Sequence, residues 1–165
     1  MTTYFAPQDL KFTQLGDVEP GSIVQIIGRE ANIPYAIRLA SEDRAEKIAV
    51  LVLGGEYAYT LSLLDRTKAT QVVIKASETR YALESPSAAG DPTHKGNLTV
   101  LEAGAFITSR ANEGAFEGTR IDLATWRAFD ARISLDVSRV YTSWKLGALN
   151  PRGDFDPIYF HGTTP

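Results

Sequence analysis

The sequence predicts a mainly β protein, an antiparallel β-sandwich or barrel with one short helix. Short segments with apolar side chains at alternate positions recur along the chain, and Gly, Pro, Asp, Asn and Ser separate them. Only one stretch, at about 122–132, has the apolar spacing of a helix. An α+β fold is the alternative, if this helix and the polar segment 41–47 are larger than the pattern indicates.

The first two predicted strands form a hairpin. Residues 22–28 follow Pro20-Gly21, a pair that favours a tight turn because Pro fixes φ and Gly tolerates positive φ. Residues 32–39 alternate between apolar and other side chains. Pro34 has no N–H to donate, so this second strand is expected to lie at a sheet edge or to begin at that residue.

The strand pattern continues through the middle of the chain. Residues 48–53 are all apolar, which predicts a strand buried on both faces, and Gly54-Gly55 ends it. Residues 56–61 alternate again. The segments 69–75 and 79–83 are expected to pair with each other.

Residues 84–97 form the longest predicted loop, and connections of this length in a compact domain are often functional or disordered. Strands are expected at 98–101 and 105–109, and a further loop at 112–118.

Residues 122–132 are the one predicted helix. Asp122 is a favourable N-cap, and Leu123, Trp126 and Phe129 recur every third residue on one face. After this helix the alternation returns at 133–137, and its phase has shifted by Val140, which predicts a bulge or a break.

Both ends of the chain differ from the body, so we expect an N-terminal arm at 1–16, a β domain at 17–146 and an extended C-terminal arm at 147–165. Gly and Pro recur through the last segment, and neither a helix nor a central strand is expected there. Both arms carry large apolar side chains that are expected to dock on a β surface of this chain or of a neighbour. The residues expected to make such contacts are Tyr4, Phe5, Phe12, Trp144, Phe155, Tyr159 and Phe160.

Composition narrows the possible functions. The chain has no cysteine, which excludes disulfides, thiolate catalysis and Cys-ligated metals. The formal net charge is −3 and Lys and Arg do not cluster, so no nucleic-acid partner is expected. The first residues lack the features of a signal peptide, and no apolar run is long enough to span a membrane, so no membrane partner is expected. These features predict a location in the cytoplasm or in an assembled particle.

No residue is assigned a catalytic, cofactor-binding or metal-binding role, and no cofactor is expected. His94 and His161 are the only histidines, and no spacing joins them to a nucleophile. Glycoside hydrolysis needs only a pair of acids at a suitable separation, and the candidates are Glu56, Glu113, Glu117, Asp154 and Asp156. The tripeptide Arg152-Gly153-Asp154 matches one that many integrin ligands display, and it is interpreted as a turn.

The predicted function is that of a non-enzymatic structural or interaction protein. It would associate with itself, or with another protein, through its terminal arms and sheet edges. Shell and virion components belong to this class. One alternative is a β domain that binds carbohydrate or another small ligand through the 84–97 loop and exposed aromatic residues, among them Tyr57, Tyr59, Tyr81, Trp126, Tyr141 and Trp144. The other is a hydrolase with paired carboxylates.

Overall fold

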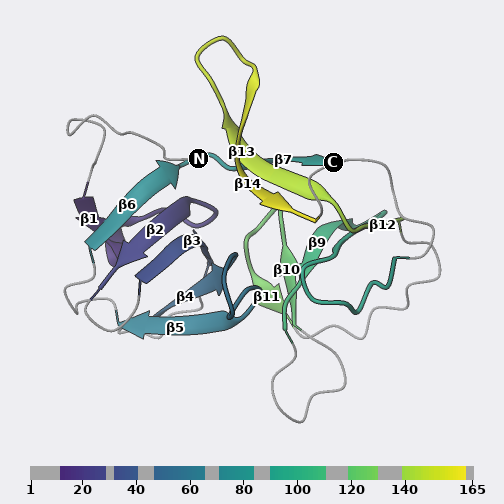
Figure 1. The fold of residues 1–165 in the computed structure, drawn as a ribbon, viewed down its shortest axis with the longest axis horizontal. Coiled ribbons are helices and arrows are strands. Elements are labelled where there is room, and N and C mark those ends of the chain that lie inside the picture. The colour runs from purple at the N-terminus through teal and green to yellow at the C-terminus, as the bar shows by residue number, and fades with distance from the viewer. Residues whose placement is uncertain are drawn as a thin grey trace.

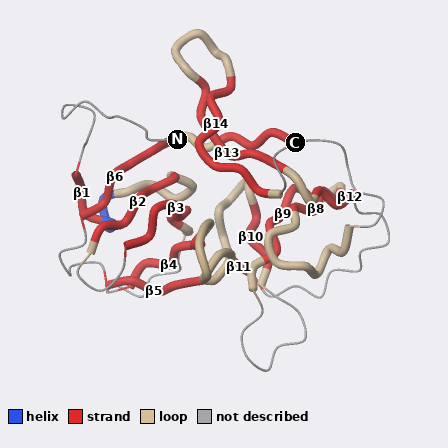
Figure 2. The backbone as a smooth tube through the Cα atoms, in the orientation of Figure 1, coloured by secondary structure: helices blue, strands red, loops and turns tan. Residues whose placement is uncertain are grey.

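The computed structural model describes residues 12–28, 32–40, 47–65, 71–83, 90–110, 119–129 and 139–162. Strand runs along most of this backbone, and the single 3-10 turn η2 (Leu15–Asp17) is the one helical element in these ranges (Figure 2). All pairs of neighbouring strands in the sheets are antiparallel. The mainly β, antiparallel prediction is therefore confirmed.

The N-terminal half forms a six-stranded sheet in the order β1-β6-β2-β3-β4-β5, on the left in Figure 1. Its strands, in chain order, are β1 (Phe12–Gln14), β2 (Ile23–Ile27), β3 (Asn32–Arg38), β4 (Lys47–Val52), β5 (Leu61–Asp65) and β6 (Gln71–Ala76). The strand that contains Pro34 was predicted to lie at a sheet edge or to begin at that residue, and both predictions are wrong: β3 lies between β2 and β4 and begins at Asn32. Around Pro34, β3 pairs with β2 only, because its pairing with β4 begins at Ala36, so the missing N–H disrupts no ladder there.

Two further sheets complete the described fold. The five-stranded sheet has the order β11-β10-β9-β8-β12, and the three-stranded sheet has the order β14-β13-β7 (Figure 1). The strands of the first are β8 (Leu98–Leu101), β9 (Gly104–Thr108), β10 (Arg120–Asp122), β11 (Ala128–Phe129) and β12 (Arg139–Tyr141). Those of the second are β7 (Arg80–Leu83), β13 (Trp144–Leu149) and β14 (Phe155–His161).

The described fold has two apolar cores, and the larger one holds the three sheets together. The main core takes side chains from all three sheets, among them Ile23, Ile37, Leu51, Leu98, Ile107, Ile121, Trp144 and Leu146. The second lies against the other face of the six-stranded sheet and contains Leu15, Val18, Val24, Ile26, Ala36, Ile48, Val50 and Val72. Strand β4 contributes Val50 to one core and Leu51 to the other, which confirms the prediction that this strand is buried on both faces.

The helix predicted at 122–132 is wrong for its described residues. Strand β10 ends at Asp122, one turn follows, and β11 begins at Ala128. The Asp122 carboxylate does accept hydrogen bonds from the Ala124 N–H and the Thr125 hydroxyl, both at 2.8 Å, as a capping residue would. Trp126 then adopts a φ of 56°, which ends the turn and reverses the chain into a hairpin.

Two other expectations also need correction. Residues 56–59, predicted as part of a strand, form a turn before β5, and Tyr59 has a φ of 63°. No central strand was expected in the predicted C-terminal arm, but its boundary at residue 147 falls inside β13. This strand is the central one of its sheet, and β14 lies at an edge. Gly and Pro are tolerated because Pro157 stands opposite Gly147, next to a bulge in the pairing. The predicted arm residues 1–11 lie outside the described ranges.

Candidate functional site

The β13–β14 hairpin projects from the body of the molecule (Figure 1). Four rings anchor its base. This ring cluster consists of Tyr59, from the turn after β4, with Trp144, Tyr159 and His161 from the hairpin. The Trp144 and His161 rings stack with centroids 5.1 Å apart, and Tyr59 meets His161 edge-on at 5.0 Å. The cluster therefore joins the last strand of the fold to the six-stranded sheet.

Three hydrogen bonds run through the ring cluster in one direction. The Tyr159 hydroxyl donates to the carbonyl of Leu53, which has no hydrogen to return. The Tyr59 hydroxyl lies 2.8 Å from that of Tyr159 and must therefore donate to it. The same Tyr59 oxygen lies 2.5 Å from Nδ1 of His161, so this nitrogen must carry the hydrogen. Satisfying all three bonds fixes the His161 tautomer with Nε2 as the acceptor nitrogen.

Burial keeps the ring cluster uncharged. It raises the pKa values of Tyr59 and Tyr159, so both phenols stay protonated at neutral pH. Burial, with a smaller contribution from His94, lowers the pKa of His161 to about 4. The cluster thus holds no phenolate nucleophile and no imidazolium, and its arrangement is that of a hydrogen-bonded anchor.

The described end of the predicted 84–97 loop packs under this anchor. Gly96 has a φ of 83°, and a Cβ at this position would lie 2.5 Å from the Tyr59 ring and 2.7 Å from the His161 ring. The Trp144 indole N–H donates to the Gly96 carbonyl at 2.9 Å. Asp91 accepts two bonds from Thr93, which lower the pKa of its carboxyl. Residues 90–97 therefore form a structured support, and residues 84–89 lie outside the described chain.

The opposite face of the hairpin is apolar and accessible. We call Lys145, Leu149, Phe155 and Phe160 the outer face, because they share the side of the sheet that is turned away from the core. Leu149 is 53% exposed and Phe160 is 48% exposed. The Lys145 ammonium lies 5.5 Å from the centre of the Phe160 ring, within reach of a cation–π contact.

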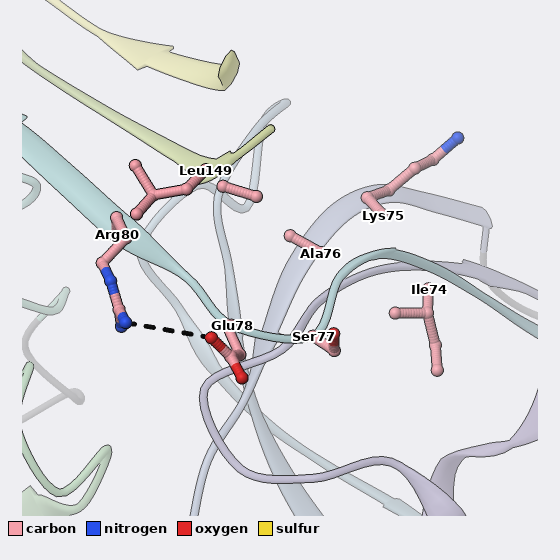
Figure 3. Close-up of a pocket in the computed structure, with 8 residues that line it drawn as sticks. Ile74, Lys75, Ala76, Ser77, Glu78, Arg80 and Leu149 are labelled. Carbon is pink, nitrogen blue, oxygen red and sulfur yellow. Dashed lines mark ion pairs between the residues drawn. The ribbon is translucent and has the colours of Figure 1, made fainter. Parts of the chain in front are cut away.

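A groove of about 520 Å³ lies between the end of β6, strand β7 and the hairpin (Figure 3). Its lining consists of Ile74, Lys75, Ala76, Ser77, Glu78, Arg80, Ala148 and Leu149. Arg80 points toward Glu78, and their charged groups are 3.8 Å apart in solvent, where such a pair contributes little. Burial lowers the pKa of Lys75. Leu149 belongs both to this groove and to the outer face.

The structure separates the predicted contact residues into three groups. Trp144 is fully buried and Tyr159 is half-buried with its hydroxyl bonded, so both anchor the hairpin. Phe155 and Phe160 lie on the outer face. Tyr4, Phe5 and the side chain of Phe12 lie outside the described residues. Sequence reasoning missed Leu149 and the anchoring role of Tyr59; the alternation along 144–149 places Leu149 in phase with Lys145 and was the available signal.

The predicted acid pairs do not meet in the groove. Glu56 lies in an exposed turn, Asp154 in the hairpin turn and Asp156 on β14, all solvent-exposed, and none of them lines the groove. Glu113 and Glu117 lie outside the described ranges. The part of the chain that the structure describes contains no group of three metal-ligating side chains. The tripeptide Arg152-Gly153-Asp154 is a turn, as predicted, in which the Asn150 side chain accepts two backbone N–H bonds.

In the part of the chain that the structure describes, no helix is long and apolar enough to cross a membrane. No family model, curated protein or solved structure matches the chain.

Proposed function

We propose that this protein is a non-enzymatic structural protein that assembles with copies of itself through the projecting hairpin. The outer face is the observation that carries the proposal. Single exposed apolar side chains are normal on a monomer, whereas the exposed Leu149 and Phe160 and the half-buried Phe155 lie on the same face of one hairpin. Covering this group with a second protein removes apolar surface from water, which favours association.

The anchor supports the same proposal. The ring cluster fixes the base of the hairpin through three hydrogen bonds and stacked rings, so little conformational freedom is lost when a partner binds. Of the six aromatic residues expected for a carbohydrate-binding face, only Tyr57 and Tyr81 are exposed, and they come from different elements, the turn after β4 and strand β7. Tyr59, Tyr141 and Trp144 are all buried, and Trp126 is partly buried against Gly21.

The test is the solution mass of the intact chain, measured by light scattering over a range of concentrations. We expect a mass above that of one chain, and we expect the double variant Leu149→Ser, Phe160→Ser to return it to that of one chain. Tyr57→Ser is the matched control, because Tyr57 is 64% exposed and lies in a turn outside the outer face. A monomeric wild-type chain at every concentration would contradict the proposal, as would an equal loss of mass in the control.

A further inference from the structure

The turn that closes the β13–β14 hairpin carries the tripeptide Arg152-Gly153-Asp154, between the end of β13 and the start of β14. Figure 2 shows this turn as the tan loop at the far end of the projecting hairpin. All three residues of the tripeptide are exposed. The tripeptide therefore stands at the tip of a projection, where a second protein can reach it.

Four hydrogen bonds to Asn150 hold the tip in one shape. The side-chain oxygen of Asn150 accepts the backbone N–H of Arg152 at 2.9 Å and that of Asp154 at 3.0 Å. Its backbone carbonyl accepts the Gly153 N–H, and its own N–H donates to the Asp154 carbonyl, both at 2.8 Å. A loop that is already ordered loses little conformational freedom on binding. The backbone of the tripeptide is thus prepared for recognition.

The charged groups of the tip are available to a partner. Among the described residues the Arg152 guanidinium has no ion-pair partner, and it does not pair with Asp154. The Asp154 carboxylate meets the Asn150 side-chain amide at 3.5 Å, which is long for a hydrogen bond. Gly153 lies between the two charged residues, and a Cβ placed on it would have no atom within 4 Å. The tip therefore offers one cation and one carboxylate on either side of bare backbone that a partner can approach closely.

These two groups suit a receptor that binds a carboxylate and a guanidinium together. A divalent cation held by a receptor takes a carboxylate oxygen as a further ligand. An acidic pocket binds the planar guanidinium through paired N–H donors. Many integrin ligands display the same tripeptide, and its charged groups here are exposed on a fixed turn.

We propose that the hairpin tip is a recognition site for an adhesion receptor of the integrin class. In the complex the Asp154 carboxylate completes the coordination of the receptor's divalent cation, and the Arg152 guanidinium enters an acidic pocket. The receptor surface lies against Gly153, between the two. The site goes beyond the proposed function and does not rest on it, because no residue of the outer face takes part.

Other partners fit the tip less well. Asp154 and Asp156 are both exposed near the tip, and their charges oppose the approach of a phosphate backbone to Arg152. A free metal ion needs more ligands than the tip offers, since the described part of the chain contains no group of three metal-ligating side chains. The carboxylate can join a metal centre only if a partner supplies the other ligands.

The test is the binding of the purified ectodomain of an integrin that recognises this tripeptide to the immobilised full chain. In the presence of Mn²⁺ we expect saturable binding, and a chelator should abolish it. Asp154→Glu displaces the carboxylate by one methylene, and Arg152→Lys keeps the charge but loses the planar fork. Each should weaken binding by about tenfold or more, which corresponds to about 1.4 kcal/mol.

Asp156→Glu is the matched control, because it makes the same change at an exposed acid two positions beyond the tripeptide. It should bind as the wild-type chain does. The backbone of residue 154 holds the turn, so Asp154→Glu should keep the urea midpoint of the wild-type chain. If Asp154→Glu lowers that midpoint, Arg152→Lys carries the test, since the Arg152 side chain takes no part in the turn bonds.

Three results would overturn the proposal: no binding in Mn²⁺, binding that survives the chelator, or an equal loss in the Asp156 control. None of them touches the self-association proposed above, because the mass of the intact chain in solution does not depend on the tip. Conversely, the Leu149→Ser, Phe160→Ser double variant should still bind the receptor as a single chain.

Discussion

The hydroxyl of Tyr59 lies 2.5 Å from Nδ1 of His161, although 102 positions of sequence separate the two residues. This contact joins the turn after β4 to the last residue of β14, so the final strand is held by a part of the chain that precedes it by more than half the sequence. Tyr59 is 4% exposed, and its hydroxyl is the middle link between His161 and Tyr159. The projecting hairpin therefore depends on one buried phenol.

Tyr59→Phe should lower the free energy of unfolding by about 1–3 kcal/mol, because the change leaves the buried Nδ1–H of His161 without its acceptor. The ring packing is kept, so the loss reports the hydrogen bonds. Urea unfolding followed by tryptophan fluorescence measures it. Tyr57→Phe removes an exposed hydroxyl two residues away and should change stability by less than about 0.5 kcal/mol. Equal effects of the two substitutions would contradict the hydrogen-bond chain.

Gly96→Ala should destabilise the protein more than Gly55→Ala. Both glycines have φ near 82–83°, so alanine meets the same backbone strain of about 1–2 kcal/mol at each. At Gly96 the new methyl also meets the Tyr59 and His161 rings, whereas at Gly55 it meets no atom within 4 Å. The difference between the urea midpoints of the two variants measures the cost of the contact between the new methyl group at position 96 and the rings of the cluster. Identical midpoints would show that the rings move aside without loss.

Local patterns predicted the strands because burial on one or both faces leaves a direct trace in the sequence. The apolar run at 48–53 became β4, and 98–101 became β8 with the predicted bounds. The helix failed for a different reason. A capping Asp followed by apolar residues at every third position is compatible with a single turn and with a helix of several turns. In the structure the positive φ of Trp126 ends the first turn after Asp122, so no helix follows.

The site was less accessible to sequence reasoning because its parts come from distant segments. Tyr59, Gly96 and His161 meet in three dimensions, and no spacing along the chain connects them. The outer face was found in part, since Phe155 and Phe160 stood out as aromatic residues in a Pro- and Gly-rich tail. Their common face depends on the bulge at Ile158, which alternation alone does not reveal.

Asp122→Ala should lower the free energy of unfolding by about 1 kcal/mol. The change removes the acceptor of the Ala124 N–H and of the Thr125 hydroxyl at the β10–β11 turn. Asp122→Asn keeps one side-chain oxygen and should recover most of the loss. Both values come from urea unfolding, and an Asn variant as unstable as the Ala variant would show that the carboxylate charge matters more than the bonds.

The stability of the protein should fall as the pH drops from about 6.5 toward 4, because the ring cluster resists protonation of His161. In the unfolded chain this histidine takes up a proton near its ordinary pKa of 6.5, whereas burial in the folded state lowers its pKa to about 4. Between these values the unfolded state binds more protons, so acid favours unfolding. The stabilisation from neutral His161 is complete above pH 6.5 and is lost as the pH falls through this window.

Unfolding free energies at pH 7 and pH 5 measure this effect before most carboxylates titrate. His161→Gln should show a smaller difference between the two pH values than the wild-type chain, although it is less stable at pH 7 because it loses the stacked ring beside Trp144. His94→Gln is the matched control, since His94 is exposed and makes only the smaller contribution to the His161 pKa. It should keep most of the pH dependence. If the difference between pH 7 and pH 5 disappeared in the His94 variant and survived in the His161 variant, the pH dependence would not come from His161 and the prediction would be wrong.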